Sequence, residues 1–372
     1  MSATYSCYIS DPYGTRLSDA LPFLTLDYTR VTGGVSAAVI TLPETAARDL
    51  IRLPDGRLEI WRRLDTGREY LDTDTTWLIR KRERTRDDRG NVVTTLTAEH
   101  PLSILREPGR FVDNFAGTGR SSQAGAADDI MKAIVRQQAG AQAGTARNLS
   151  PYLTVAPDMS MGPAIARSFA WRAVLDVLQD LADDAAQQGA YVTFDIVSLD
   201  TQGYEFRTYV GQRGVDRRAG SSLQPLILSP EFGNLGSTTL IEDYTEEITY
   251  AKYGGAGERS ARITADYLDT IRAGASPFGR REYWGENTQT ADTTVLTGQA
   301  RSAVRTGRAR LLFTGTLIDT PDTRYGVQWQ WGDYVTAQDF GAGFDCRIDA
   351  VSVSVAGGEE RISASLRAEL AL

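Results

Sequence analysis

The stretch Tyr325-Gly326-Val327-Gln328-Trp329-Gln330-Trp331-Gly332-Asp333-Tyr334-Val335-Thr336 combines large aromatic side chains with two glycines, directly ahead of a segment of strand composition. Its two tryptophans are two residues apart, so in an extended chain both indole rings would point to the same side. The Gly-Asp pair favours a turn before the next strand, 334–338. The stretch therefore predicts a corner entering a β-barrel or sandwich, with a structural motif made of Tyr325, Gly326, Trp329, Trp331, Gly332 and Asp333.

Length and composition indicate a globular protein of two or three domains. The chain has 372 residues, 41% of them hydrophobic and 9% aromatic, which is enough for real cores. The two cysteines, Cys7 and Cys346, lie near opposite ends, and His100 is the single histidine. A disulfide framework and a Cys/His zinc site are therefore excluded, and we expect neither a cofactor nor a metal.

Charge and the first residues bear on location and partners. The net charge is −8, whereas proteins that bind the nucleic-acid backbone are usually basic. Residues 1–5 lack the basic region and the apolar run of a signal peptide, and no stretch is apolar enough to span a bilayer. We expect a protein that is made and assembled in the cytoplasm.

One basic run, Arg80-Lys81-Arg82-Glu83-Arg84-Thr85-Arg86, departs from this balance. It is followed at once by Asp87 and Asp88, and it continues a strand that begins at Trp77. A solvated strand face or an ion-paired seam between subunits is favoured over a nucleic-acid contact, because a binding face would lack acids so close by.

Residues 1–100 have the pattern of a small β-domain. Alternating or apolar segments bounded by turn residues predict strands, at 23–28, 39–42, 58–61, 77–85 and 92–98. Residues 87–91 favour a hairpin turn between the last two strands. A short helix is predicted at 45–51.

Residues 101–225 change to a helical or mixed α+β pattern. Apolar residues at helical spacing predict helices at 128–138 and at 163–188, the second starting at Pro163 and stopping at Gly189. A hairpin is predicted from strands 191–197 and 204–210, around the turn at 200–203.

Residues 226–372 return to strands. A long alternating strand is predicted at 239–253, and the glycines that follow at 254–257 indicate a turn or bulge rather than a phosphate-binding loop. A loop-rich insertion is expected around 258–310, with a helix at 291–307 inside it.

Catalytic patterns are weak throughout. His100 precedes Pro101 and has no nucleophile motif to accompany it. Adjacent acids such as Glu246 and Glu247 face different ways on a strand or helix, so they form no acid–base pair. The sequence predicts no catalytic residues, and we expect a protein that is not an enzyme.

The chain also contains an internal repeat. Residues 55–100 and 333–369 share one order of parts: an acidic turn, a short strand, a glycine turn, a long strand, a polar hairpin turn and a final strand. A chance likeness of two β-meanders is the alternative. The predicted fold is α+β and mainly β, with two similar small β-barrel domains and a helical or mixed α+β domain inserted between them.

Several segments together resemble the tail-hub, or baseplate-hub, proteins of long-tailed phages, which form the N-terminal hub region of tail-associated lysin-like proteins. They are Trp77-Leu78-Ile79, Thr95-Leu96-Thr97-Ala98-Glu99-His100-Pro101-Leu102, the strand from Tyr244 to Gly255, and the closing motif around Trp331. The resemblance implies tail-tube-like barrels in a trimeric ring, which joins the hexameric tail tube to tip or fibre proteins and lines the channel for DNA. It implies location in the virion tail and, because the chain stops at Leu372, separate proteins for wall cutting or receptor binding.

Two other functions stay open at this stage. The same hub could serve a phage-like contractile injection device, which the sequence does not separate from a tail. A carbohydrate-binding or carbohydrate-active β-protein would use Tyr283, Trp284 and Trp329 on an open face, whereas a hub would bury its aromatics.

If the repeat is real, three subunits place six similar units around the axis, and we expect a neutral to acidic channel wall that DNA passes without binding.

Overall fold

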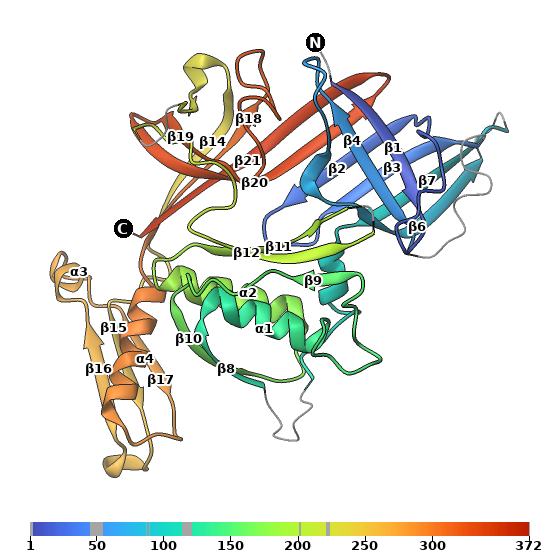
Figure 1. Cartoon of the computed structure of the whole chain (residues 1–372). Helices are drawn as coiled ribbons and strands as arrows, with labels where there is room; N and C mark the ends of the chain where they lie inside the picture. The colour runs from blue at the N-terminus through green and yellow to red at the C-terminus, as the bar shows by residue number, and fades with distance from the viewer. Residues whose placement is uncertain are drawn as a thin grey trace.

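The computed structural model describes residues 3–44, 55–86, 88, 90–113, 121–200, 202–220 and 224–371. The molecule is mainly β, and its largest element is a 13-stranded sheet in the described residues (Figure 1). We call two sets of its strands the first half and the second half. The first half consists of β1 (Thr4–Ser10), β2 (Thr25–Val31), β3 (Ala37–Pro43), β4 (Arg57–Arg63), β5 (Glu69–Leu71), β6 (Trp77–Arg86) and β7 (Val92–Glu99). The second half consists of β13 (Ile227–Leu228), β14 (Leu235–Asp243), β18 (Arg310–Ile318), β19 (Tyr334–Asp339), β20 (Ala342–Ala356) and β21 (Glu359–Ala371).

The two halves have the same strand order. The first half runs β1-β4-β6-β7-β3-β2 across the sheet, and the second half runs β13-β19-β20-β21-β18-β14. β5 is left out of this comparison, and the other strands are matched in chain order, β1 with β13, β2 with β14, β3 with β18, β4 with β19, β6 with β20 and β7 with β21. Each matched pair of strands then occupies the same position across its half of the sheet. One pairing differs, because β1 is antiparallel to β4 whereas β13 is parallel to β19. The predicted internal repeat is therefore present in the strand topology.

Even the irregularities of the halves correspond. Between β6 and β7 the register shifts after Ile79, and between β20 and β21 it shifts after Ile348. Next to each bulge, Leu78 faces Arg57 on β4 and Arg347 faces Tyr334 on β19. Ile79 and Ile348 thus occupy the same place in the two halves.

The halves are joined by direct strand pairing. β20 is 15 residues long, so its first part pairs with β19 while its second part, from Ala350 to Ala356, pairs with β2 of the first half. The mainly β fold with two similar units is confirmed. The pairings among the described strands close no barrel, which differs from the expected pair of separate barrels, because β2 adds to the other half instead of returning to its own.

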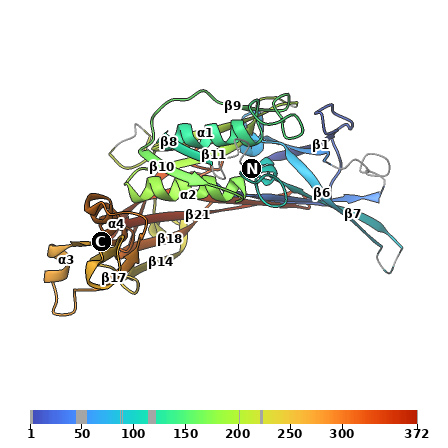
Figure 2. The ribbon, with the colours of Figure 1, turned by 90° about the horizontal axis from the view of Figure 1, so that it is seen from below.

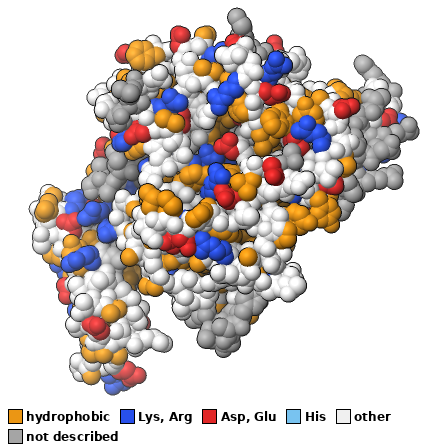
Figure 3. Space-filling view, in the orientation of Figure 1, with side chains coloured by type: hydrophobic (Ala, Val, Ile, Leu, Met, Phe, Trp, Pro, Cys, Tyr) orange, Lys and Arg blue, Asp and Glu red, His pale blue; other side chains and the backbone are white. Residues whose placement is uncertain are grey.

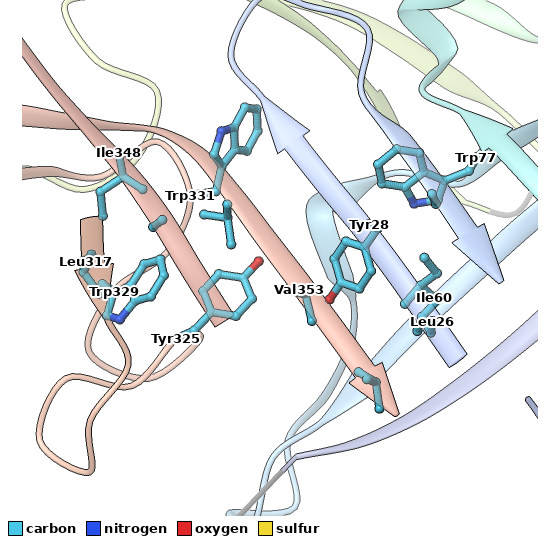
Figure 4. Packing of buried hydrophobic residues seen from close by; sticks show 14 of the residues in the cluster. Leu26, Tyr28, Ile60, Trp77, Leu317, Tyr325, Trp329, Trp331, Ile348 and Val353 are labelled. Carbon is cyan, nitrogen blue, oxygen red and sulfur yellow. The ribbon is translucent and has the colours of Figure 1, made fainter. Parts of the chain in front are cut away.

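A single hydrophobic core crosses this junction. It contains buried residues of both halves, among them Leu26, Ile60, Leu317, Ile348 and Val353. Figure 4 shows labelled residues of both halves side by side, from Leu317 and Trp329 at one end to Ile60 and Trp77 at the other. Because apolar side chains from both halves leave water together, the halves pack as one unit.

The described residues between 101 and 210 form a mixed layer below the sheet (Figure 1). Its elements are β8 (Ser121–Ala126), α1 (Ala127–Gln138), β9 (Leu153–Val155), β10 (Ala164–Phe169), α2 (Val174–Gln187), β11 (Val192–Ser198) and β12 (Tyr204–Val210). The first predicted helix and the hairpin are confirmed. The helix predicted at 163–188 is half wrong, because residues 164–169 pair with β8 and only the later part is helical. No described helix has the length and apolar character to cross a membrane.

The insertion in the second half is a small α/β unit. It comprises β15 (Tyr250–Gly254), β16 (Thr264–Leu268), α3 (Thr270–Gly274), β17 (Glu282–Glu286) and α4 (Thr293–Thr306). The strands pair in the order β16-β15-β17, and the buried Leu296, Ala300 and Val304 lie on α4. The predicted single strand at 239–253 is wrong, since β14 and β15 belong to different sheets. Figure 2 shows this unit at one end of the molecule and the β6–β7 hairpin at the other.

Short 3-10 helices complete the described structure, namely η2 (Asp72–Asp74), η3 (Pro101–Leu105), η4 (Pro230–Phe232) and η5 (Arg259–Ala261). The helix predicted at 45–51 lies outside the described residues.

Candidate functional site

The structural motif of Tyr325, Gly326, Trp329, Trp331, Gly332 and Asp333 lies in the loop between β18 and β19. Tyr325, Trp329 and Trp331 are all buried there, with at most 4% of each side chain exposed. Gly326 and Gly332 have φ angles of 77° and 84°, a region that favours glycine, so the chain turns twice instead of running straight. Both turns lie outside the segment from Trp329 to Trp331, and the two indoles belong to the same buried cluster.

The two tryptophans belong to the same core cluster but have different partners. Trp329 packs in the common core against Tyr325, with ring centroids 4.9 Å apart, and its indole N–H donates to the Thr323 carbonyl. Trp331 donates instead to the Asp349 carbonyl at 3.3 Å. Figure 4 shows the two rings apart, with Tyr325 beside Trp329.

Asp333 ties the motif to the middle layer. Its buried carboxylate accepts hydrogen bonds from the Gln330 N–H at 2.9 Å, the Val215 N–H at 2.7 Å and the Arg217 Nε at 2.8 Å. A Cβ on the neighbouring Gly214 would lie 2.5 Å from the Asp333 Oδ1, so only glycine fits. The segment after β12 is thus held against the loop before β19.

Trp331 lies between two guanidinium groups. The Cζ of Arg213 is 3.5 Å from the centroid of the indole ring, and the Cζ of Arg30 is 4.2 Å from it. Both are cation–π contacts, and they are stronger when water is excluded, as it is here. Arg30 comes from β2, Arg213 from the segment after β12, and Trp331 from the second half, so the stack joins all three parts of the chain.

Asp195 on β11 balances these cations. Its carboxylate lies 2.5 Å from the Arg30 Nη2 and 3.0 Å from the Arg213 Nη2, and the side chains of Asp195 and Arg30 are at most 1% exposed. Burial acts to raise the pKa of Asp195, but Arg30 and Arg213 outweigh it and lower the pKa to about 2. We call Arg30, His100, Asp195, Arg213 and Trp331 the arginine cluster.

His100 completes the arginine cluster without acting as a base. Its Nδ1 accepts a hydrogen bond from the Leu102 N–H, and its Nε2 lies 3.4 Å from Asp195. Burial, reinforced by the nearby Arg30, holds the pKa of His100 well below its usual range, so the ring is neutral. Its role is to close the buried network at the end of β7.

A second buried network, which we call the tyrosine cluster, joins the halves on the other side of the motif. It contains Tyr5, Tyr28, Arg62, Tyr70, Asp72, Tyr325 and Glu360. The Asp72 carboxylate accepts hydrogen bonds from the hydroxyls of Tyr28 and Tyr325, one from each half. Arg62 donates to the Glu360 carboxylate and to the Tyr325 carbonyl, both at 2.9 Å. A Cβ on Gly326 would lie 2.3 Å from the Tyr70 hydroxyl oxygen, so this turn also requires glycine.

A cavity of about 830 Å³ opens beside the arginine cluster. Trp61, Tyr209, Arg213 and Trp331 line it, together with the acids Glu59, Asp74, Asp200 and Asp333. Each of these acids has partners. Glu59 bonds Ser10, Arg16 and Trp61, and Asp333 is held as described above. Asp74 lies 3.4 Å from Arg213, and Asp200 accepts hydrogen bonds from the Gln202 and Gly203 N–H groups. The described residues contain no group of acids, histidines and cysteines placed to hold a metal ion. The cavity offers a binding surface lined by aromatic and charged side chains.

The aromatics considered for glycan binding do not meet. Trp329 is fully buried, so that part of the carbohydrate interpretation is wrong. Tyr283 and Trp284 on β17 are 42% and 48% exposed, but neighbouring residues of a strand point to opposite faces. They make no shared platform for a sugar ring.

The basic run lies on β6 and is largely exposed. Arg80 pairs with Asp55, Lys81 with Glu83, and Arg84 with Glu44. Such exposed pairs contribute little to stability, on the order of 0–1 kcal/mol each. The strand face is therefore solvated in the single chain, as the sequence favours.

Asp349, at the bulge of β20, provides a test of this junction by pH. Burial raises the pKa of Asp349 to about 6, with Arg367 and Arg347 offsetting it only in part. The folded chain then binds this proton more tightly than the unfolded chain does, so the charged carboxylate costs stability above pH 6 and the cost fades as the pH falls towards 3.8. We expect Asp349→Asn to raise the free energy of unfolding by about 1–3 kcal/mol at pH 8 and by little at pH 4.

Urea unfolding at the two pH values measures this difference. Asp27→Asn is the matched control, since Asp27 on β2 is exposed, and we expect almost no change at either pH. A stabilisation by Asp349→Asn that is equal at pH 8 and pH 4 would contradict the assignment.

The chain matches the family described as Siphovirus ReqiPepy6 Gp37-like protein over residues 8–366. Solved structures with a similar fold include the tail protein from Neisseria meningitidis MC58, at 12% identity and a TM-score of 0.54, covering 98% of this chain and 96% of that one. The 43 kDa tail protein of prophage MuSo2 from Shewanella oneidensis has 12% identity and a TM-score of 0.55, with 98% of each chain covered.

The prophage tail protein gp18 from Listeria monocytogenes EGD-e has 12% identity and a TM-score of 0.51, covering 97% of this chain and 94% of that one. At these identities the likeness is one of fold. No curated protein matches the chain in sequence.

Proposed function

The chain belongs to the Siphovirus ReqiPepy6 Gp37-like family, and from this premise we propose that it is the structural hub of a phage tail tip or baseplate. In this proposal three copies form a ring in the virion tail, assembled in the host cytoplasm. The ring joins the hexameric tail tube to distal tip or fibre proteins, and DNA leaves through its centre. The role is structural and not enzymatic.

The observation that carries the proposal is the equal strand order of the two halves. A trimer of chains with two matching units presents six similar units around its axis. A sixfold tube can then dock on a threefold ring through nearly equivalent contacts. A chain with a single unit would offer the tube only three.

The arginine and tyrosine clusters support a rigid building block. Each network contains groups from both halves, and most of these groups are buried. Breaking one partner of a buried ion pair is costly, so the halves keep a fixed relative orientation. A ring subunit needs such a fixed angle between its units, because small errors add up around the axis.

Charge supports passage of DNA without binding. The chain carries 48 acidic and 40 basic residues, and Figure 3 shows both signs interspersed on the face in view. DNA binding would require a continuous basic surface, from which counterions are released. The channel wall of the ring is neutral to acidic in this proposal, and the basic run on β6 faces protein.

The test is the state of the purified chain. We expect light scattering at high protein concentration to give three times the mass of the chain, and electron microscopy to show rings with a central opening. We also expect the rings to bind duplex DNA weakly at physiological salt. A strict monomer that forms no ring even with tail-tube protein, or tight salt-sensitive DNA binding, would refute the proposal.

A further inference from the structure

We propose that strand β14 of one copy pairs, antiparallel, with residues Lys81–Arg86 of strand β6 in the next copy. This inference rests on the ring of the preceding section and specifies how its copies meet. It is drawn from the contact between the two halves of one chain, which provides a template for the contact between chains.

The template is the addition of β2 to β20. Residues Thr25–Val31 of β2 lie opposite Ala356–Ala350 of β20. The same edge of β20 is occupied by β19 nearer its start, and β21 covers the other edge. Both edges of β20 are therefore paired, and β2 of the other half completes the edge that β19 pairs only in part.

β6 is the counterpart of β20, but its edge is only partly filled. β4 pairs with Trp77 and Leu78 alone, while β7 pairs with the other edge of β6 as far as Arg86. Among the described strands none pairs with the remaining edge, from Lys81 to Arg86. This is the position that β2 occupies on β20.

β14 is the counterpart of β2, and it too has an open edge. In the described part of the chain it pairs only with β18, so it ends the strand path of the large sheet. Ile241 on this strand is 44% exposed, and the acidic residues Glu242 and Asp243 beside it are exposed as well. Figures 1 and 2 place β14 and the β6–β7 hairpin at opposite ends of the molecule, so the two edges face different neighbours.

The register follows from the equivalent positions. Thr29 pairs with Ala37 on β3, just as Thr239 pairs with Thr314 on β18, so the β2 and β14 positions differ by 239 − 29 = 210. Because the two bulges correspond, Ile348 and Ile79 are equivalent residues, so the β20 and β6 positions differ by 348 − 79 = 269.

Two pairs on the template then give the contact. Arg30 faces Val351 and Val31 faces Ala350. The β14–β2 difference is added to the β2 residue, and the β20–β6 difference is subtracted from the β20 residue. This puts Leu240 opposite the next copy's Arg82, and Ile241 opposite the next copy's Lys81. In the template, the Thr32 N–H also donates to the carbonyl of the bulge residue Asp349. The counterpart of this hydrogen bond runs from the Glu242 N–H to the carbonyl of the bulge residue Arg80 in the next copy.

Charge favours this pairing. From Arg80 to Arg86, β6 carries five basic residues and one acid, Glu83, whereas β14 ends in Glu242 and Asp243. Backbone hydrogen bonds give the affinity and the opposite charges fix the register. The basic run is then explained as a seam between copies, and neither exposed edge is left as a site for aggregation.

The contact is head to tail, so it propagates. β14 of each copy meets β6 of the next, and every unit around the axis is joined to its neighbour by the same kind of strand addition. The ring closes when the rotation per copy divides a full turn.

Disulfide trapping tests the register. Ile241→Cys combined with Lys81→Cys places two exposed positions opposite each other across the seam, and the native Cys7 and Cys346 are buried. Under mild oxidation we expect covalent dimers and larger oligomers on non-reducing gels. The matched control is Ile241→Cys with Arg82→Cys, one residue out of register and on the other strand face, where we expect at least tenfold less cross-linking.

The outcomes separate this inference from the proposed function. If rings form in light scattering but the matched pair cross-links no better than the control, the strand pairing is wrong while the ring stands. If neither rings nor cross-links form, both fail. Cross-linking specific to the matched pair in chains that form rings supports both.

Discussion

Replacing Trp331 by alanine is expected to lower the free energy of unfolding by about 3–5 kcal/mol, which is the range for truncating a buried tryptophan. The indole is 4% exposed and lies between the guanidinium groups of Arg30 and Arg213. Its removal leaves a cavity and also separates two cations from the ring that lies between them. Urea unfolding followed by circular dichroism measures the loss.

The control is Trp284→Ala on β17, which removes an indole that is 48% exposed. We expect its effect to stay within about 0.5–1 kcal/mol, because little buried area is lost. An unchanged unfolding curve for Trp331→Ala would show that the stack contributes nothing to the junction. Loss of binding to a glycan array with an unchanged unfolding curve would favour the carbohydrate interpretation.

Replacing Asp195 by alanine is expected to cost about 3–5 kcal/mol as well, for an electrostatic reason. The side chain of Arg30 is fully buried, and Asp195 is the acid that bonds it in the arginine cluster. Without that carboxylate, Arg30 and Arg213 repel each other in a site with little water, and a buried charge left uncompensated is expensive. Thermal and urea unfolding at pH 7 measure the effect.

A double variant shows whether the two substitutions act on one network. Asp195 and Trp331 share Arg30 and Arg213 as partners, so the loss in Asp195→Ala/Trp331→Ala should fall short of the sum by about 0.5–3 kcal/mol. Additive losses would mean that the stack and the ion pairs are independent. If the double variant does not fold, the same cycle with Trp331→Phe, a smaller change, provides the measurement.

The sequence predicted the repeat because its signal is local. Strand lengths and turn residues in 55–100 and 333–369 follow one order, and β4, β6 and β7 match β19, β20 and β21 in the structure. The resemblance to phage tail proteins is confirmed by the family match and the fold for the same reason, since it rests on the order of segments. The pairing of β2 with β20 had no such signal, because the residues of an edge strand do not specify which strand will pair with it.

The wrong predictions share a cause, which is that tertiary context overrode the local pattern. Residues 164–169 have an apolar Ile165 and Phe169 that fit a helix face, yet they pair with β8 and point the same two side chains into the middle core. The single strand predicted at 239–253 likewise divides between two sheets, because β14 pairs with β18 whereas β15 pairs with β16 and β17.

The arginine cluster was missed altogether. Arg30, Asp195 and Arg213 lie in three segments, and the first two are 165 positions apart in sequence. Arg30 and Arg213 look like ordinary surface charges in their own segments, and only the packing of β11 against the two halves makes a buried network of them with Asp195. A single buried-looking acid on β11, in the apolar run Val192–Ser198, was the one sequence sign of it.

The pairing of β2 with β20 also bears on how the chain folds as it is synthesised. β2 is complete by residue 31, but its partner on β20 is made some 320 residues later, and ribosomes add roughly 5–20 residues per second. One edge of β2 therefore stays unpaired for on the order of 20–60 seconds during synthesis. Contacts so distant along the chain slow folding, and an unpaired edge can join another nascent chain. We therefore expect expression at low temperature, which lowers the number of nascent chains present at once, to increase the soluble fraction.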